Sequence, residues 1–174
     1  MNISGSAGGP ARLRRPGFEG GGMDQVLRDR VSRAMSASNS LADALDEALL
    51  GQRNGETPSV SIGSQFWCVV GARESYSAGI AAGGWAGFSC SIGRAQAKQR
   101  AALLAALERS RALVLETLDQ HADDAARTAL AYDLLEHEAQ HQGQLIRYFY
   151  TNGFAFPPDF AKRYALQQPA GALV

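Results

Sequence analysis

The chain has 174 residues, which suits one domain with a full hydrophobic core, and its 17 basic residues balance 17 acidic ones. This neutrality argues against a nucleic-acid-binding protein, which normally carries a basic surface, and two Cys residues are too few for a disulfide-rich secreted scaffold. Because the longest apolar run, Ala101–Leu107, is far shorter than the ~20 residues that span a bilayer, and no signal peptide is evident, we expect a cytoplasmic protein without membrane partners.

Residues 1–22 are rich in glycine, contain two prolines and have little apolar content. Such a segment buries too little apolar surface to offset the entropy of ordering, so it is predicted to be a flexible tail. It is a native arm, a tag remnant or a stretch ahead of a true start at Met23, and the sequence leaves all three open. The predicted folded domain covers residues 23–168, and residues 169–174 form a short C-terminal tail.

Two helices are predicted in the first half of the chain. From Asp24 to residue 50, small and apolar residues recur every three or four positions, and Gly51 follows as a C-terminal glycine. After a polar loop, a second helix is predicted from about Ser61 to Gly83, with the apolar side chains Phe66, Trp67, Val69, Val70, Tyr76 and Ile80. Residues 85–93 are predicted to form a loop whose two aromatic side chains pack against the bundle.

The second half predicts two long helices and a short one. A third helix is expected from about Arg94 to Gln120, with an inward stripe of Leu104, Leu107, Val114 and Leu118. A fourth follows a polar break and runs to about Thr151, and a short fifth helix follows Pro157-Pro158 and extends through Leu166. Four long helices with short connections, and no extended period-two pattern, predict an all-α, antiparallel four-helix bundle.

Two of the three histidines, His137 and His141, lie four residues apart on the core-facing stripe of the fourth helix. This spacing sets both imidazoles side by side, which favours chelation of Zn, Ni, Fe or Cu. The alternative is two ordinary core histidines, which is costly because two adjacent titratable groups are then buried without a shared partner. His121 lies in a polar stretch and is predicted to face solvent.

The segment from His137 to His141 also matches the H-E-x-x-H motif of zinc peptidases, in which Glu138 would be the general base. The only acidic residue downstream is Asp159, in a proline-linked turn, and Arg147 stands where a metzincin carries its third His. No sheet is predicted that could hold an extended substrate. A peptidase is therefore the minor alternative.

Cys68 lies in the middle of the predicted second helix, within an apolar segment. A thiolate is a strong ligand for zinc and other borderline metals, whereas a small buried side chain is the common alternative for a free Cys. Nothing in the position of Cys90 indicates a role.

The stretch Tyr132–Leu166 resembles the last helix and tail of the DinB/YfiT-like superfamily, with H-x-x-x-H, then x-G-Q-L, an aromatic-rich turn and a glycine. Residues Ser61–Ile80 resemble the second helix of that family, in which a metal-binding His precedes Arg and Tyr at the spacing of Arg73 and Tyr76. The resemblance covers most of residues 24–166. It implies an up-and-down or crossover four-helix bundle that holds one divalent metal, and homodimers are common among relatives.

By this resemblance, His137 and His141 are metal ligands, and Cys68 stands where the family has a His. Either Cys68 replaces that ligand, giving three protein ligands and an open position, or metal binding is lost. The resemblance implies zinc or nickel and a thiol or water nucleophile, because characterised relatives include transferases of low-molecular-weight thiols such as bacillithiol or mycothiol. The alternative is a metal-free binding module.

Four further side chains receive expected roles. Glu138 acts as an acid or base or supports a metal ligand through a hydrogen bond, or it is simply a solvated side chain. Gln144 contacts a metal-bound water, and Tyr76 lines the pocket or belongs to the core. Arg73 binds a substrate carboxylate or forms a structural salt bridge. The expected substrate is a small molecule, and a homodimer is expected because the first and third helices carry apolar or small residues on more than one face.

Overall fold

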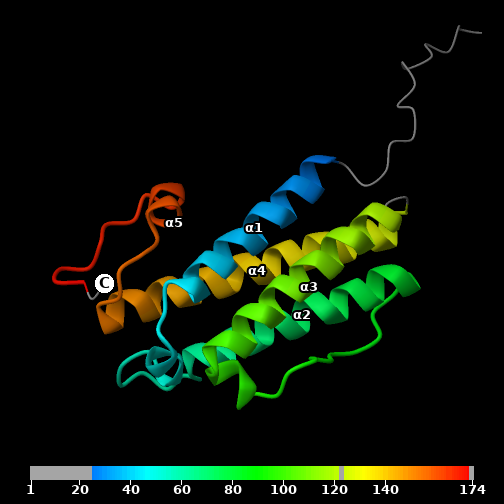
Figure 1. Cartoon of the computed structure of the whole chain (residues 1–174). Helices are drawn as coiled ribbons and strands as arrows, with labels where there is room; N and C mark the ends of the chain where they lie inside the picture. Colours follow the sequence, from blue (N-terminus) through cyan, green and yellow to red (C-terminus); the bar gives the residue numbers. More distant parts are fainter. Residues whose placement is uncertain (1–24, 122–123, 173–174) are drawn as a thin grey trace, which may run out of the picture.

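The computed structural model describes residues 25–121 and 124–172, so the predicted tail at residues 1–22 lies outside the described residues. The described helices are α1 (Gln25–Asp43), α2 (Ile62–Ala82), α3 (Arg100–Gln120), α4 (Ala125–Asn152) and α5 (Pro158–Arg163), with 3₁₀ turns η1 (Glu47–Gly51) and η2 (Gln96–Lys98). This part of the chain has no strand, which confirms the predicted all-α bundle (Figure 1). None of these helices combines the length and the apolar character of a membrane span.

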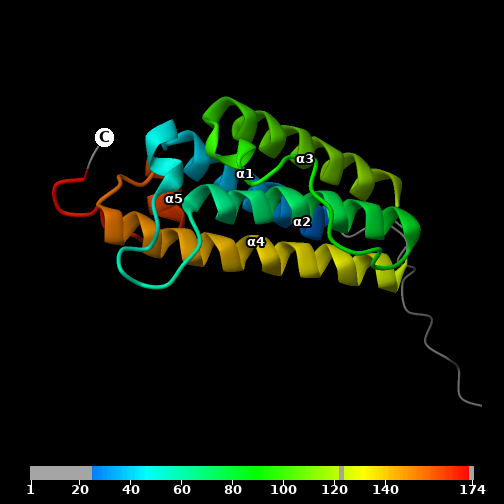
Figure 2. The ribbon, with the colours of Figure 1, turned by 90° about the horizontal axis from the view of Figure 1, so that it is seen from below.

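The four long helices lie side by side, but they do not simply alternate in direction (Figures 1 and 2). α1 and α4 run one way, and α2 and α3 run the other way, because residues 83–99 return along the bundle before α3 begins. The prediction of antiparallel neighbours is wrong at this connection. The third helix begins at Arg100 rather than Arg94, and its first N–H group, that of Arg100, donates to Glu47 Oε2 at 2.8 Å.

The ends of α2 and α4 follow from their capping residues. Ser61 accepts a hydrogen bond from the backbone N–H of Ser64, and Gly83 closes α2 in the left-handed conformation at φ 76°. At the start of α4, the Asp124 side chain accepts a hydrogen bond from the backbone N–H of Arg127, and Gly153 ends the helix in the left-handed conformation at φ 69°. These boundaries agree with the predicted ones.

The prediction for the first helix is wrong in its last turns, because α1 ends at Asp43 and the chain continues into η1. The guanidinium of Arg100 donates to the carbonyl oxygens of Asp43 and Leu45, which a longer helix would use itself. The fifth helix also ends early, at Arg163, since Ala165 adopts a left-handed conformation at φ 52°.

The core consists of two apolar clusters, one toward each end of the bundle. The larger includes Phe66, Leu107 and Phe149, and the smaller includes Leu27 and Leu134. A layer of buried polar side chains lies between the clusters along α1, α2 and α4, namely Ser38, Arg73, Glu138 and Gln142. On α3, Leu103 is fully buried and the predicted core residue Leu104 is only partly buried.

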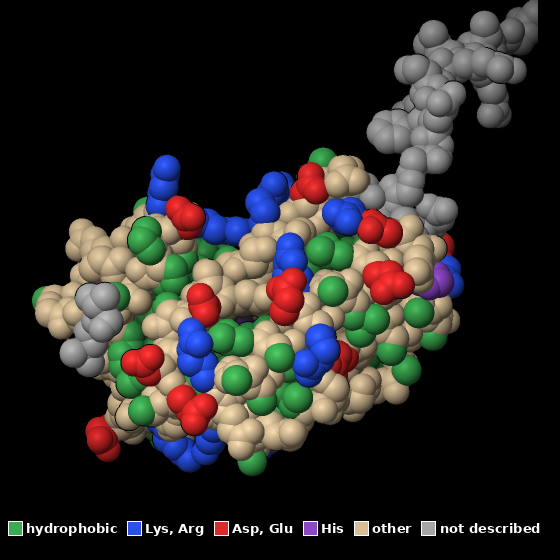
Figure 3. All heavy atoms as spheres, viewed as in Figure 1, with side chains coloured by type: hydrophobic (Ala, Val, Ile, Leu, Met, Phe, Trp, Pro, Cys, Tyr) green, Lys and Arg blue, Asp and Glu red, His purple; other side chains and the backbone are tan. Residues whose placement is uncertain are grey.

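The loop after α2 contacts the bundle through both of its aromatic residues. Phe88 packs on Trp67 with ring centroids 5.1 Å apart, and Trp85 packs on Tyr76 at 4.9 Å, although both loop side chains stay about half exposed. On the face that Figure 3 shows, acidic and basic side chains are interspersed. This mixing agrees with the equal numbers of the two charges in the sequence.

Candidate metal centre

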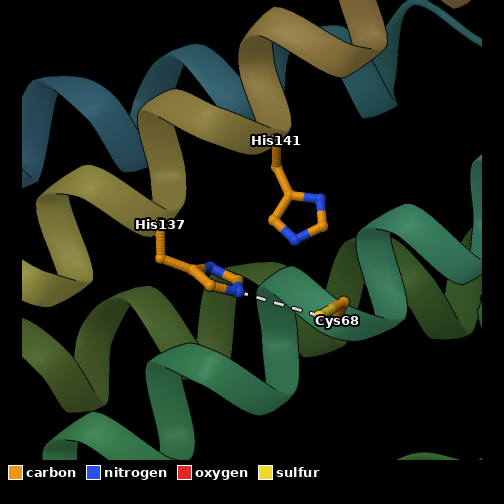
Figure 4. A group of neighbouring side chains, drawn as sticks. All are labelled: Cys68, His137 and His141. Atoms are coloured by element: carbon orange, nitrogen blue, oxygen red, sulfur yellow. Dashed lines mark hydrogen bonds between the residues drawn. The ribbon is translucent and has the colours of Figure 1, made fainter.

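Cys68 of α2 and His137 and His141 of α4 point toward one another in the space between the two helices (Figure 4). Cys68 Sγ lies 3.7 Å from His137 Nε2, and one ligand atom from each of the three residues lies within 4.8 Å of the others. Tetrahedral zinc with bonds of about 2.3 Å to sulfur and 2.0 Å to nitrogen separates these ligands by about 3.5 Å. The structure therefore brings the three predicted ligands together in a group that could bind a metal ion.

The relative position of α2 and α4 at this site is fixed by a buried ion pair. Arg73 Nε donates to Glu138 Oε1 at 2.6 Å, Arg73 Nη2 reaches Oε2 at 3.2 Å, and both side chains are fully buried. Ser38 of α1 also donates to Glu138 Oε2, at 2.5 Å. Arg73 thus forms the structural salt bridge, one of its two expected roles, and the carboxylate of Glu138 lies among α1, α2 and α4.

This environment differs from that of a zinc-peptidase general base. Such a base must reach a metal-bound water, whereas both oxygens of Glu138 are bound by Arg73 and Ser38 and its side chain is fully buried. Asp159, the third ligand that a peptidase would need, is exposed on α5 in a groove beside α1. The only described group of metal-ligating side chains is formed by Cys68, His137 and His141.

The imidazole of His141 is oriented by Gln65, which is not among the predicted site residues. His141 Nδ1 lies 2.6 Å from Gln65 Oε1, and because a carbonyl oxygen only accepts, Nδ1 carries the proton. Nε2 then keeps its lone pair for a metal. Gln65 Nε2 donates in turn to Tyr148 Oη at 3.4 Å. The sequence signal for Gln65 is a polar residue one helical turn before Cys68 in an otherwise apolar stretch.

Burial sets the protonation of the three side chains. It lowers the pKa of His137, and together with the neighbouring His137 it lowers the pKa of His141 to about 4, so both imidazoles are neutral at pH 7. Burial raises the pKa of the Cys68 thiol, against the opposing charge of Arg94. His137 Nδ1 is also buried without a hydrogen-bond partner among the described residues. Two neutral imidazoles and a thiol that a metal can deprotonate are suitable ligands for a metal ion.

The other two predicted site residues line separate hollows beside the cluster. The ring of Tyr76 lies 6.5 Å from that of His137 and borders a hollow of about 150 Å³. Gln144 is exposed and lines a larger cavity together with Gln65. His121 ends α3 outside the cluster.

Comparison of the chain with protein-family models, curated proteins and solved structures finds no match. The chemistry of the site therefore follows from its own geometry. One sulfur and two nitrogen atoms from two helices would supply three of the four ligands that a tetrahedral metal ion needs. In a catalytic zinc site the fourth position is open to water or substrate, whereas in a structural site a fourth protein ligand fills it.

Proposed function

We propose that the protein is a DinB/YfiT-like, metal-dependent enzyme in which Cys68, His137 and His141 hold one zinc or nickel ion. The observation that carries this proposal is the convergence of the three side chains between α2 and α4 (Figure 4).

The proposed reaction uses a thiol or a water molecule as nucleophile. A divalent cation supplies the positive charge that lowers the pKa of a coordinated thiol or water toward neutrality. The protein contributes neutral imidazoles, because burial lowers the pKa of both His137 and His141. Gln65 presents Nε2 of His141 toward the centre, and the ring of the partly buried Tyr76 lies 6.5 Å from that of His137. The proposed substrates are a low-molecular-weight thiol and a small electrophile.

Metal content tests the proposal directly. We expect untagged protein to bind about one zinc or nickel ion per chain, and Cys68→Ala and His137→Ala to weaken that binding by at least about 100-fold, since each removes one of three ligands. Cys90→Ala is the matched control, because Cys90 lies outside the ligand group and its thiol donates to the Trp67 carbonyl. Elemental analysis and competitive chelator titration measure both quantities. Fewer than about 0.1 ions per chain, without uptake of added metal, would contradict the proposal.

A further inference from the structure

A cavity of about 370 Å³ lies beside the candidate metal centre, where the loop between η1 and α2 faces α4. This volume falls in the range of about 300–1,000 Å³ that small-molecule sites occupy. Gln65 links the two places, because its side chain lines the cavity while its Oε1 accepts from His141. Gln144 and Arg147, which follow His141 on α4, line the same cavity.

Arg147 brings a positive charge to the cavity wall. Its side chain is exposed, and among the described residues its guanidinium has no hydrogen bond, ion pair or cation–π contact. The planar guanidinium matches a carboxylate, which it binds through two parallel hydrogen bonds. Arg147 lies six residues beyond His141, about 9 Å further along the helix axis at 1.5 Å per residue. A ligand of a few heavy atoms can bridge such a separation once the long Arg side chain is included.

Asn54 supplies a second polar group to the same cavity. The residue is 9% exposed, and its Oδ1 is buried without a hydrogen-bond partner. Its backbone is fixed, because its N–H donates to Ser59 Oγ at 3.0 Å and its carbonyl accepts from Thr57 at 3.1 Å. An unsatisfied buried oxygen is costly, so an N–H or O–H group of a ligand that reached Oδ1 would gain a hydrogen bond that the folded chain leaves unmade.

We propose that this cavity binds a small organic carboxylate that also carries an amide N–H or a hydroxyl group. The carboxylate contacts Arg147, and the N–H or O–H group donates to Asn54 Oδ1, which has to turn toward the cavity because this oxygen has almost no accessible surface in the structure. One part of this inference rests on the proposed function. It takes the ligand to be the thiol or the electrophile of the proposed reaction, with its reacting atom beside Cys68, His137 and His141. The cavity then selects substrates by their anionic end, and the metal centre acts on the other end.

Two matched thiols test the carboxylate contact in zinc-loaded protein. N-acetylcysteine and N-acetylcysteamine share the thiol and the amide N–H, and they differ only in the carboxylate. We expect N-acetylcysteine to bind at least about tenfold more tightly by calorimetry, the size of one charge-assisted hydrogen bond. Arg147→Gln should abolish this preference and Arg147→Lys should retain part of it. Arg109→Gln is the control, because Arg109 is an exposed arginine on α3 outside the cavity.

Asn54→Ala tests the second contact. It should weaken both thiols by similar factors, because both carry the amide N–H, and it should leave the preference for the carboxylate unchanged. Equal affinity of the two thiols for the wild-type protein, or a preference that survives in Arg147→Gln, would overturn the inference. Competition by inorganic phosphate as strong as that by N-acetylglycine would overturn the assignment to a carboxylate.

A probe without a thiol separates this inference from the proposed function. N-acetylglycine has the carboxylate and the amide N–H, so we expect it to bind the metal-free protein. Arg147→Gln should lower its affinity about tenfold, as measured by chemical-shift titration. Binding of N-acetylglycine by a protein that takes up no metal would support the cavity and contradict the proposed function. Normal metal uptake with no Arg147-dependent binding of any of these probes would contradict the cavity alone.

Discussion

Gln65 is not a candidate metal ligand, but it orients His141, so it can determine whether the site binds a metal ion. Its Oε1 accepts from His141 Nδ1, and without this acceptor the ring can rotate or protonate at the other nitrogen. The residue lies on the helix that carries Cys68, so packing of α2 against α4 positions a ligand and its orienting group together.

We expect Gln65→Leu to weaken zinc or nickel binding by about 10–100-fold, the usual cost of losing an orienting hydrogen bond to a ligand. Gln65→Glu keeps an acceptor for Nδ1–H and should bind the metal much more tightly than Gln65→Leu does. A competitive titration against a chromophoric chelator measures both variants. Unchanged affinity in Gln65→Leu would show that the contact with His141 has no role in metal binding.

The lowered pKa of His141 makes the stability of the metal-free protein depend on pH. The pKa is about 4 in the folded chain and roughly 6.5 when unfolded, so between these values the unfolded chain binds the extra proton. The free energy of unfolding should therefore be highest above pH 6.5 and fall by up to about 3 kcal/mol as the pH drops toward 4. Urea unfolding with a chelator between pH 7.5 and 4.5 measures this slope. His141→Gln should make this slope shallower, with the remainder coming from His137, whose pKa burial also lowers, and a slope as steep as that of the wild type would assign the effect to other groups.

At the residue scale, spacing and resemblance predicted the three candidate ligands, because a helix fixes the relation of residues four apart. Asn54, Gln65 and Arg147 were not predicted, since they meet only where the loop between η1 and α2 faces α4. Their proximity depends on tertiary packing, which local sequence patterns do not predict.

At the scale of elements, α4 carries two inward-facing stripes rather than one, and the first is only partly buried at its two histidines. His137 and His141 face α2, whereas the next residue of each, Glu138 and Gln142, contacts Ser38 of α1. Sequence periodicity predicted only the first stripe, so Glu138 looked like a solvated or catalytic side chain. The second stripe exists because α4 packs against both α1 and α2, which widens its buried arc.

The buried ion pair of Arg73 and Glu138 connects the second stripe of α4 to α2, and its contribution to the free energy of unfolding can be measured. We expect Glu138→Ala to destabilise the protein by about 3–5 kcal/mol, because it leaves the Arg73 guanidinium buried without its carboxylate. The double variant Arg73→Met with Glu138→Leu should recover most of that loss, since it removes both charges. Denaturant unfolding compares the three proteins. A double variant as unstable as Glu138→Ala would mean that shape and hydrogen bonding, rather than the unpaired charge, account for the loss.

At the scale of the whole molecule, the sequence predicted the helices and their packing into a bundle, but not the direction of every neighbour. Hydrophobic spacing and capping residues located α2 and α4 to within about a residue, because those signals are local. The parallel course of α2 and α3 depends on residues 83–99, which fold back along α2. Ser75 and Glu74 of α2 hold this segment through hydrogen bonds to Ser89 and Ser91.

The distance along the chain between Cys68 and His137 has a consequence for unfolding. The two residues are 69 positions apart, so a cation held by both turns the intervening chain into a closed ring. By loop-closure entropy, a cross-link of that span restricts the unfolded chain by about 4 kcal/mol at 25 °C. The ring contains most of α2, all of α3 and the first half of α4, whereas α1 and α5 lie outside it. In the metal-loaded protein, α1 and α5 can therefore unfold locally, whereas the unfolding of α2, α3 and α4 is coupled through the bound cation.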